Sequence, residues 1–300
     1  MNLLHPSSLT AFGLLVLAAA VPARAFSAAE DFSSYSAPTT FTNAAVISTA
    51  GAGTAGTGAS GNGWLTGWRS STSTGLAQTV GVNNSSPVNS GGNYLTANIV
   101  TKSDGADVGK DATSIARAYD VVGGGLAASS AVTVSFDFRV DAIDTANMRY
   151  DLFDNSTRGT GATSASYNFR TSNGVWGYFN GITLVETTMA FTAGTTYSFS
   201  IVLNPIASTY TFSLGNGVTS VSGTSAAFRN SGFATDAATG SVGGRWLTFN
   251  ANETTNVLGQ TTTFSVDNIS ISAVPEPSTY ALFSGAAFLG TAALRRRSRR

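Results

Sequence analysis

The sequence contains no cysteine and a single histidine, His5. The absence of cysteine excludes disulfide bonds, thiolate metal sites and cysteine nucleophiles. His5 lies in an N-terminal segment that we expect to be removed, so the mature chain would have no histidine. That excludes the Ser-His-Asp triad, the usual general base and the usual zinc ligand.

Charged residues are also scarce. They make up 11% of the 300 residues, against about a quarter in typical globular domains. The formal net charge is zero, but residues 26–277 hold 10 basic and 16 acidic residues, a net of −6. Five further basic residues close the chain: Arg295, Arg296, Arg297, Arg299 and Arg300. A mildly acidic body lacks the clustered basic face that nucleic acid requires, so we expect no nucleic-acid partner.

The N-terminal residues 1–25 have the features of a signal peptide. An apolar run, Leu9–Ala20, precedes Pro22, and the small residues Ala23 and Ala25 fit the rule for signal peptidase cleavage. We therefore predict a signal helix that is removed after Ala25. The alternative is an uncleaved anchor, which the run disfavours because it is shorter than the ~20 residues that a membrane span needs.

The C-terminal residues 274–300 carry three features in order. Two prolines come first, then an apolar stretch at 279–294, then the arginine cluster. We predict that 279–294 forms a short transmembrane helix, with the arginines left in the cytoplasm. The prolines end any secondary structure before it.

This order resembles the PEP-CTERM sorting signal of exported proteins, which a membrane exosortase processes. The motif itself comprises Val274, Pro275, Glu276 and Pro277. The resemblance implies export, an inner-membrane anchor before processing, and then a place on the outer surface or in an exopolysaccharide or biofilm matrix. The alternative is a plain tail-anchored protein, although ordinary anchors require no Pro-Glu-Pro segment before the span.

The body of the chain, 26–273, shows a β pattern. Apolar and polar residues alternate over 132–140 and again over 197–203, which a turn joins to 210–214 as a hairpin. Further strands are predicted at 148–153, 167–170, 175–179 and 263–272. No amphipathic helix of convincing length occurs in this body, so we predict an all-β fold, a two-sheet antiparallel jelly-roll sandwich.

Two local features interrupt this pattern. The apolar residues fall on even-numbered positions before Asp267 and on odd-numbered positions after Asn268, and this change in the alternation predicts a β-bulge. Residues 48–62 are low in complexity and rich in glycine, which predicts a flexible loop inside the sandwich. A phosphate-binding loop is excluded there, because no lysine follows the glycines and no helix opens after them.

The body resembles concanavalin A-like, laminin-G-like bacterial domains in several short motifs. The motifs are Glu30-Asp31-Phe32, Gly61-Asn62-Gly63-Trp64 with Gly67-Trp68, Ala193-Gly194-Thr195-Thr196-Tyr197, and Val266-Asp267-Asn268-Ile269. The resemblance implies a jelly roll whose first and last strands pair. It also implies glycan binding or adhesion, and in some members a calcium ion.

Two sets of residues are candidates for binding. Glycan binding uses exposed aromatic rings, and the candidates are Trp64, Trp68, Trp176 and Tyr178, with Trp246 as a further tryptophan. The alternative is that these tryptophans belong to the core. A calcium ion needs several oxygen ligands, and the candidates are Glu30, Asp31 and Asp267. The alternative is that Asp267 and Asn268 satisfy backbone groups at the bulge.

The carboxylates give weaker support for catalysis. Glycoside hydrolysis needs two carboxylates across a cleft, but the E-x-D-x-x-E arrangement of concanavalin A-like hydrolases does not occur. Asp137 and Asp141 share the polar face of one predicted strand, where solvated charges normally lie. We therefore expect an exported structural or adhesive protein that binds an exopolysaccharide or other glycan and is not an enzyme. The alternative is an extracellular glycosidase or lyase on the same fold.

Overall fold

In a computed structural model, most of the predicted body is described. The described residues are 27–42, 63–64, 67–101, 111–119, 131–142, 148–155, 161–230, 245–254 and 259–274, apart from short gaps at 34, 36, 65–66, 74, 86–87, 89–91 and 163. The predicted signal segment with Ala23 and Ala25, the glycine-rich loop 48–62, and Pro275, Glu276, Pro277 and the helix predicted at 279–294 lie outside these ranges.

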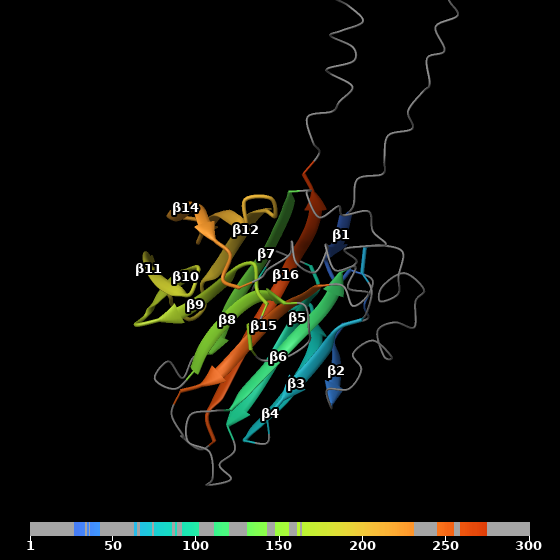
Figure 1. Ribbon diagram of the computed structural model, residues 1–300. Helices are drawn as coiled ribbons and strands as arrows, with labels where there is room; N and C mark the ends of the chain where they lie inside the picture. The colour runs from blue at the N-terminus through green and yellow to red at the C-terminus, as the bar shows by residue number, and fades with distance from the viewer. Residues whose placement is uncertain are drawn as a thin grey trace, which may run out of the picture.

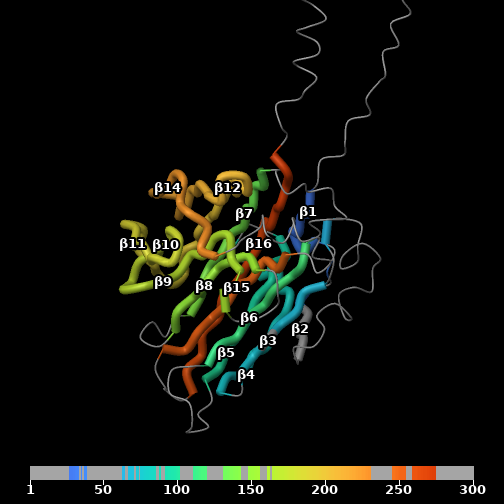
Figure 2. The backbone as a smooth tube through the Cα atoms, viewed as in Figure 1, coloured from blue at the N-terminus to red at the C-terminus, as the bar shows by residue number. Residues whose placement is uncertain are grey.

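The described residues form sixteen strands in two antiparallel sheets (Figures 1 and 2). The nine-stranded sheet has the order β14 (Ser220–Ala227), β13 (Thr209–Gly215), β12 (Thr196–Asn204), β7 (Val132–Ala142), β16 (Thr261–Ala273), β5 (Tyr94–Thr101), β4 (Leu76–Asn83) and β2 (Thr39–Thr42), with β1 (Ser27–Glu30) also paired to β16. The seven-stranded sheet has the order β11 (Thr183–Ala190), β10 (Val175–Asn180), β9 (Asn168–Ser172), β8 (Met148–Asn155), β15 (Arg245–Glu253), β6 (Ala112–Tyr119) and β3 (Arg69–Thr72).

This arrangement confirms the predicted all-β sandwich. The predicted hairpin is β12–β13, with Ile201 opposite Phe212 and Leu203 opposite Tyr210. The pairing of the first and last strands, which the resemblance implied, is also present, because Ser27 of β1 lies opposite Ser272 of β16. No helix occurs in the described ranges.

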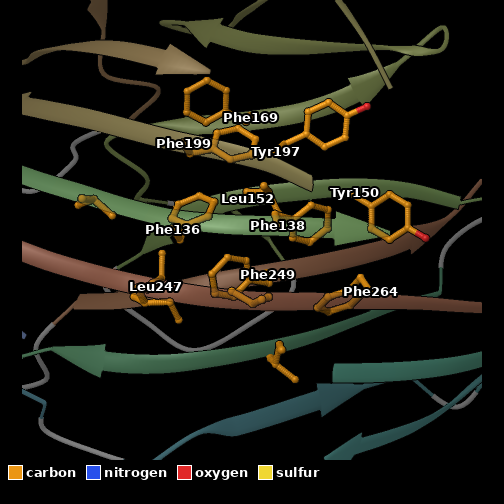
Figure 3. Close-up of a cluster of buried hydrophobic side chains, with 14 of the residues drawn as sticks. Phe136, Phe138, Tyr150, Leu152, Phe169, Tyr197, Phe199, Leu247, Phe249 and Phe264 are labelled. Carbon is orange, nitrogen blue, oxygen red and sulfur yellow. The ribbon is translucent and has the colours of Figure 1, made fainter. Parts of the chain in front are cut away.

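The core lies between the two sheets and is rich in aromatic rings (Figure 3). Phe136 of β7 stacks on Phe199 of β12, with ring centroids 4.9 Å apart, and meets the ring of Phe249 of β15 edge-on at 5.1 Å. The ring of Phe169 of β9 packs edge-on against that of Phe199, with centroids 5.1 Å apart. The alternation of β7 and β12 places these rings inward, and each buried ring contributes about 1.5–3 kcal/mol through removal of apolar surface from water.

The predicted β-bulge is present in β16. The register against β7 changes between Asp267 and Ser270, and Asn268 has a φ of 51°. The extra residue lets Val266 before the bulge and Ile269 after it both face the core, where each is at most 2% exposed.

Two ion pairs are buried within the sandwich. Arg117 of β6 pairs with Glu30 of β1, which joins a strand of one sheet to a strand of the other. Arg245 of β15 donates to Asp154 of β8, with Nε 2.7 Å from Oδ2, and both side chains are fully buried. Charges buried this deeply are retained only where a partner and hydrogen bonds compensate for the lost water.

Candidate functional site

The tryptophans predicted for glycan binding lie in the core, which was the alternative open from the sequence. Trp64 is 1% exposed, and Trp68 and Trp176 are 0% exposed. The Trp176 ring packs edge-on against Phe199 at 5.1 Å. Tyr178 is half-buried and packs against Phe212 of the opposite sheet, with centroids 4.7 Å apart. A sugar ring cannot stack on the three tryptophans in this conformation, so they do not form a binding surface.

The residues predicted to bind calcium each have protein partners. Glu30 pairs with Arg117 and accepts the Phe32 N–H at 2.9 Å, and burial raises the pKa of its carboxyl. Asp31 accepts the hydroxyl and the N–H of Ser33 at 2.7 and 3.0 Å, and these bonds lower its pKa.

Asp267 accepts the N–H of Asn268 at 2.8 Å, as expected for a side chain that satisfies the bulge. Glu30 itself lies opposite Ile269, beyond that bulge. In the described part of the chain, no three acidic or histidine side chains converge on a point where a metal ion could sit.

The outer face of the seven-stranded sheet carries an unusual set of buried polar side chains. On β15, Leu247 and Phe249 face the core, so the neighbouring Thr248 and Asn250 point away from it. Thr248 is nevertheless 0% exposed and Asn250 is 1% exposed. Ser114, Asp151 and Asn155 are buried on the same face. Polar groups are rarely buried without partners, so this face is more than a solvated surface.

Asp151 of β8 lies at the centre of this face and holds two arginines. Its Oδ1 accepts from Arg170 Nε at 2.6 Å, and its Oδ2 lies 3.2 Å from both Arg170 Nη2 and Arg149 Nε. Asn252 also donates to Oδ2, at 2.8 Å. The residue opposite Asp151 on β9 is Arg170 and the one opposite on β15 is Asn250, so strand register assembles this cluster.

A third arginine joins the cluster from the segment after β14. Arg229 donates to Asn168 Oδ1, and its guanidinium lies 3.9 Å from the centroid of the Phe179 ring, while that of Arg170 lies at 5.0 Å. Burial lowers the pKa of Arg229, and the positive charges of Arg170 and Arg149 lower it further, although Asp151 opposes them. We call Arg149, Arg170 and Arg229 the arginine triad.

Trp246 is the tryptophan that does not lie in the core. It is half-buried on the outer face of β15, opposite Asn155 of β8 and Ala118 of β6. Asn155 is fixed by bonds to Gly161 and Ser164. Asn250, Asp151 and Arg170 lie side by side across β15, β8 and β9, and we call them the Asp151 row. Trp246 is four residues along β15 from Asn250, a separation of about 13 Å. One oligosaccharide is long enough to contact both the indole ring and this row.

Among the described residues, the carboxylates on the two outer faces do not form an evident catalytic pair. Asp137 and Asp141 are four residues apart on one strand, a separation of about 13 Å along the backbone. Asp151 of β8 and Glu186 of β11 lie level with each other across three strand spacings, a separation of about 14 Å. Both separations exceed the roughly 5–10 Å that glycoside hydrolysis uses.

Asp137 and Asp267 lie directly opposite each other, which is a closer spacing. However, Asp267 is 2% exposed and accepts the Asn268 N–H, while the Asn268 side chain donates to Asp137 at 2.7 Å. Ser198 donates to the other oxygen of Asp137 at 2.5 Å. Both carboxylates are therefore occupied with holding the bulge.

The sequence analysis did not identify the arginine triad. Arg149 and Asp151 are two residues apart on a predicted strand, and this spacing places them on one face, which was a usable signal. The contributions of Arg170 and Arg229 depend on strand pairing and on a contact between distant segments, which local spacing does not reveal.

Comparison with known families gives one match, at the C-terminus. Residues 273–297 match the model of the PEP-CTERM protein-sorting motif. The motif begins where β16 ends, and the Val274 N–H donates to the carbonyl of Ala131 at 2.8 Å. Within the described ranges no helix is long and apolar enough to cross a membrane, and the helix predicted at 279–294 lies beyond them.

No curated protein matches the chain, but solved structures do. A protein of unknown function from Shewanella oneidensis MR-1 aligns with a TM-score of 0.49 and 16% identity, over 83% of this chain and 86% of that one. The catalytic domain of a glycoside hydrolase family 131 protein from Coprinopsis cinerea aligns at 0.45 and 14%, over 67% and 78%. A sialidase aligns at 0.41 and 16%, over 75% of this chain but only 19% of its own length. At these scores the likenesses carry no argument about activity or ligand.

Proposed function

We propose that the chain, which carries a PEP-CTERM sorting motif and is therefore exported and directed to the surface, binds a polysaccharide of the cell surface or extracellular matrix. The binding surface is the outer face of the seven-stranded sheet. The protein acts there as an adhesive or structural component.

The observation that carries this proposal is the position of Trp246. Its half-buried indole ring lies on the outer face of β15 with a small residue, Ala118, beside it on β6. A sugar ring stacks on an indole through its apolar face while its hydroxyls need polar partners at the edge. Arg170, whose side chain is 21% exposed and which lies opposite Asp151 further along the face, offers such a partner.

Binding is favoured over catalysis by the arrangement of the acidic groups. The described carboxylates on the outer faces are either too far apart for glycoside hydrolysis or engaged at the bulge. Asp154 is fully buried and committed to Arg245. The function that fits these residues is recognition of a glycan without cleavage.

The route to the surface is also part of the proposal. Signal cleavage after Ala25 releases the chain, and the segment 279–294 holds it in the inner membrane until an exosortase-type enzyme processes the motif at Val274–Pro277. The mature protein is then the β-sandwich 26–273 or slightly more. Mass spectrometry of the protein from its native cells tests this route, and a mature form that retains the terminal arginines contradicts it.

The binding proposal is tested with the purified full-length protein on an array of neutral and acidic polysaccharides, with and without calcium. We expect at least one polysaccharide to bind. Trp246→Ala should weaken that binding about tenfold or more, equivalent to about 1.4 kcal/mol of binding free energy. Trp246→Phe keeps an aromatic ring and should retain most of it. No binding to any polysaccharide, or binding by Trp246→Ala equal to that of the unchanged protein, refutes the proposal.

A further inference from the structure

We infer that the outer face of the seven-stranded sheet recognises an acidic polysaccharide and that the arginine triad binds its carboxylate groups. This inference rests on the proposed function and specifies the class of glycan.

The cationic side chains are distributed unevenly over the described residues. These cations are seven arginines: Arg69, Arg117, Arg139, Arg149, Arg170, Arg229 and Arg245. Arg117 and Arg245 are buried in ion pairs, and Arg139 lies on the outer face of the nine-stranded sheet. The other four lie on the outer face of the seven-stranded sheet, since Arg69 is opposite the outward Ala116 of β6. In a body with a net charge of −6 over residues 26–277, four of the seven described arginines thus lie on one face.

The arginine triad carries more positive charge than its protein partner neutralises. Asp151 pairs with Arg149 and Arg170, and Arg229 lies near enough for its pKa to respond to all three groups, so among the described residues one carboxylate faces three guanidiniums, an excess of two charges (3 − 1). Glu186 is in the same register row as Arg170 but two strands away, a separation of about 10 Å, and it accepts from Ser172 and Asn173. Asp151 therefore positions Arg149 and Arg170 without balancing the triad.

The side chains of the arginine triad are held in place by their partners, and two of them are partly exposed to solvent. The Arg149 side chain is 36% exposed and that of Arg170 is 21% exposed, whereas the Asp151 side chain between them is 5% exposed. Phe179 lies under the guanidiniums of both Arg170 and Arg229. Stacking on an aromatic ring and bonding to one carboxylate restrict these long side chains, so a ligand would find them largely preorganised.

The like charges within the triad repel one another, which indicates a role for an anion. The lowered pKa of Arg229 reflects burial first and then the fields of Arg170 and Arg149. Like charges held together raise the free energy of the folded chain, and an anion bound between them relieves that repulsion. The planar fork of arginine matches a carboxylate, with two parallel N–H···O bonds. A uronate-type polysaccharide supplies such carboxylates, and another sugar ring of the same polymer can reach Trp246, about 13 Å away along β15.

The test compares two polymers with the same sugar backbone, one with free carboxylates and one with esterified carboxylates. The purified full-length protein is titrated with polygalacturonate and with fully methyl-esterified polygalacturonate, in which each carboxylate is masked. We expect polygalacturonate to bind at least about tenfold more tightly, and its affinity to fall as salt is raised. Dextran sulfate, an anion without carboxylates, should bind more weakly than polygalacturonate.

Arg229→Gln is the diagnostic variant, and Arg139→Gln is its matched control on the opposite face. Arg139 is half-buried like Arg229, and it pairs with Asp141 at 2.5 Å where Arg229 donates to Asn168. We expect Arg229→Gln to lose about tenfold in affinity for polygalacturonate and Arg139→Gln to lose almost none. If Arg229→Gln unfolds, Arg229→Lys keeps the charge without the fork and should show a smaller loss.

Several results overturn the inference. They are equal binding of the two galacturonate polymers, equal or tighter binding of dextran sulfate, or equal losses in Arg229→Gln and Arg139→Gln. If a neutral polysaccharide binds in a Trp246-dependent way while polygalacturonate does not, the inference fails and the proposed function stands. If no polysaccharide binds, both fail.

Discussion

The buried ion pair between Asp154 and Arg245 gives a sharp prediction about stability. Arg245 Nε lies 2.7 Å from Asp154 Oδ2, and neither side chain has exposed surface. Asp154 also accepts the Ser166 N–H at 2.6 Å, the Ser166 hydroxyl at 2.8 Å and the Tyr167 N–H at 3.2 Å. Asp154→Asn preserves the shape but leaves the guanidinium without a counter-charge and replaces one acceptor oxygen by a donor.

The expected loss follows from the burial of the remaining charge. Removing one partner of a buried ion pair costs about 3–5 kcal/mol of the free energy of unfolding. For a sandwich of this size, that corresponds to a fall of about 10 °C in Tm. Asp154→Asn combined with Arg245→Met removes both charges, keeps an acceptor oxygen for the Ser166 and Tyr167 N–H groups, and should recover much of the loss.

Asp141→Asn is the control, because it makes the same change in a solvent-accessible pair. The Arg139 and Asp141 side chains are 22% and 25% exposed, and such pairs contribute less than about 1 kcal/mol. Urea and thermal unfolding followed by circular dichroism measure all four proteins. Equal losses in Asp154→Asn and Asp141→Asn, or a double variant as unstable as Asp154→Asn, would refute the reasoning.

Two further predictions concern the core. Trp176→Ala should cost about 3–5 kcal/mol in urea unfolding because it leaves a cavity among packed rings, whereas Trp246→Ala on the outer face should cost about 1 kcal/mol; similar losses would contradict these positions. Burial raises the pKa of Glu30 above its usual 4.5, so the folded state holds this proton more tightly than the unfolded state. The resulting contribution to stability is present below pH 4.5 and is lost as pH rises through the folded pKa. Glu30→Gln should flatten that decline in Tm, and an unchanged slope would contradict it.

The sequence predicted best those strands that have one buried face. Strand β7 alternates strictly, and its burial alternates with it along Val132–Ala142. Strand β6, Ala112–Tyr119, is buried at every position, so its sequence shows no period of two and it was not predicted. Strand β14, Ser220–Ala227, was missed for the opposite reason, because it is an edge strand made mostly of small polar residues.

The candidate site was only partly predictable for a related reason. The sequence left open whether the tryptophans are surface ligands or core residues, and three of the four are buried in the core. Trp64 and Trp68 are even stacked with a buried cation, since the Arg117 guanidinium lies 4.5 and 6.0 Å from their rings. The arginine triad draws on three segments that meet only after the sheet has formed.

Hydroxyl-radical footprinting of the full-length protein with a bound polysaccharide tests the central claim most directly. The account predicts that the polysaccharide lowers oxidation of Trp246 on the seven-stranded sheet. Oxidation of Ile206 and Val218, which are 77% and 91% exposed in turns of the nine-stranded sheet, should not change. Protection of Ile206 and Val218 with no change at Trp246 would place the binding surface elsewhere and contradict the account.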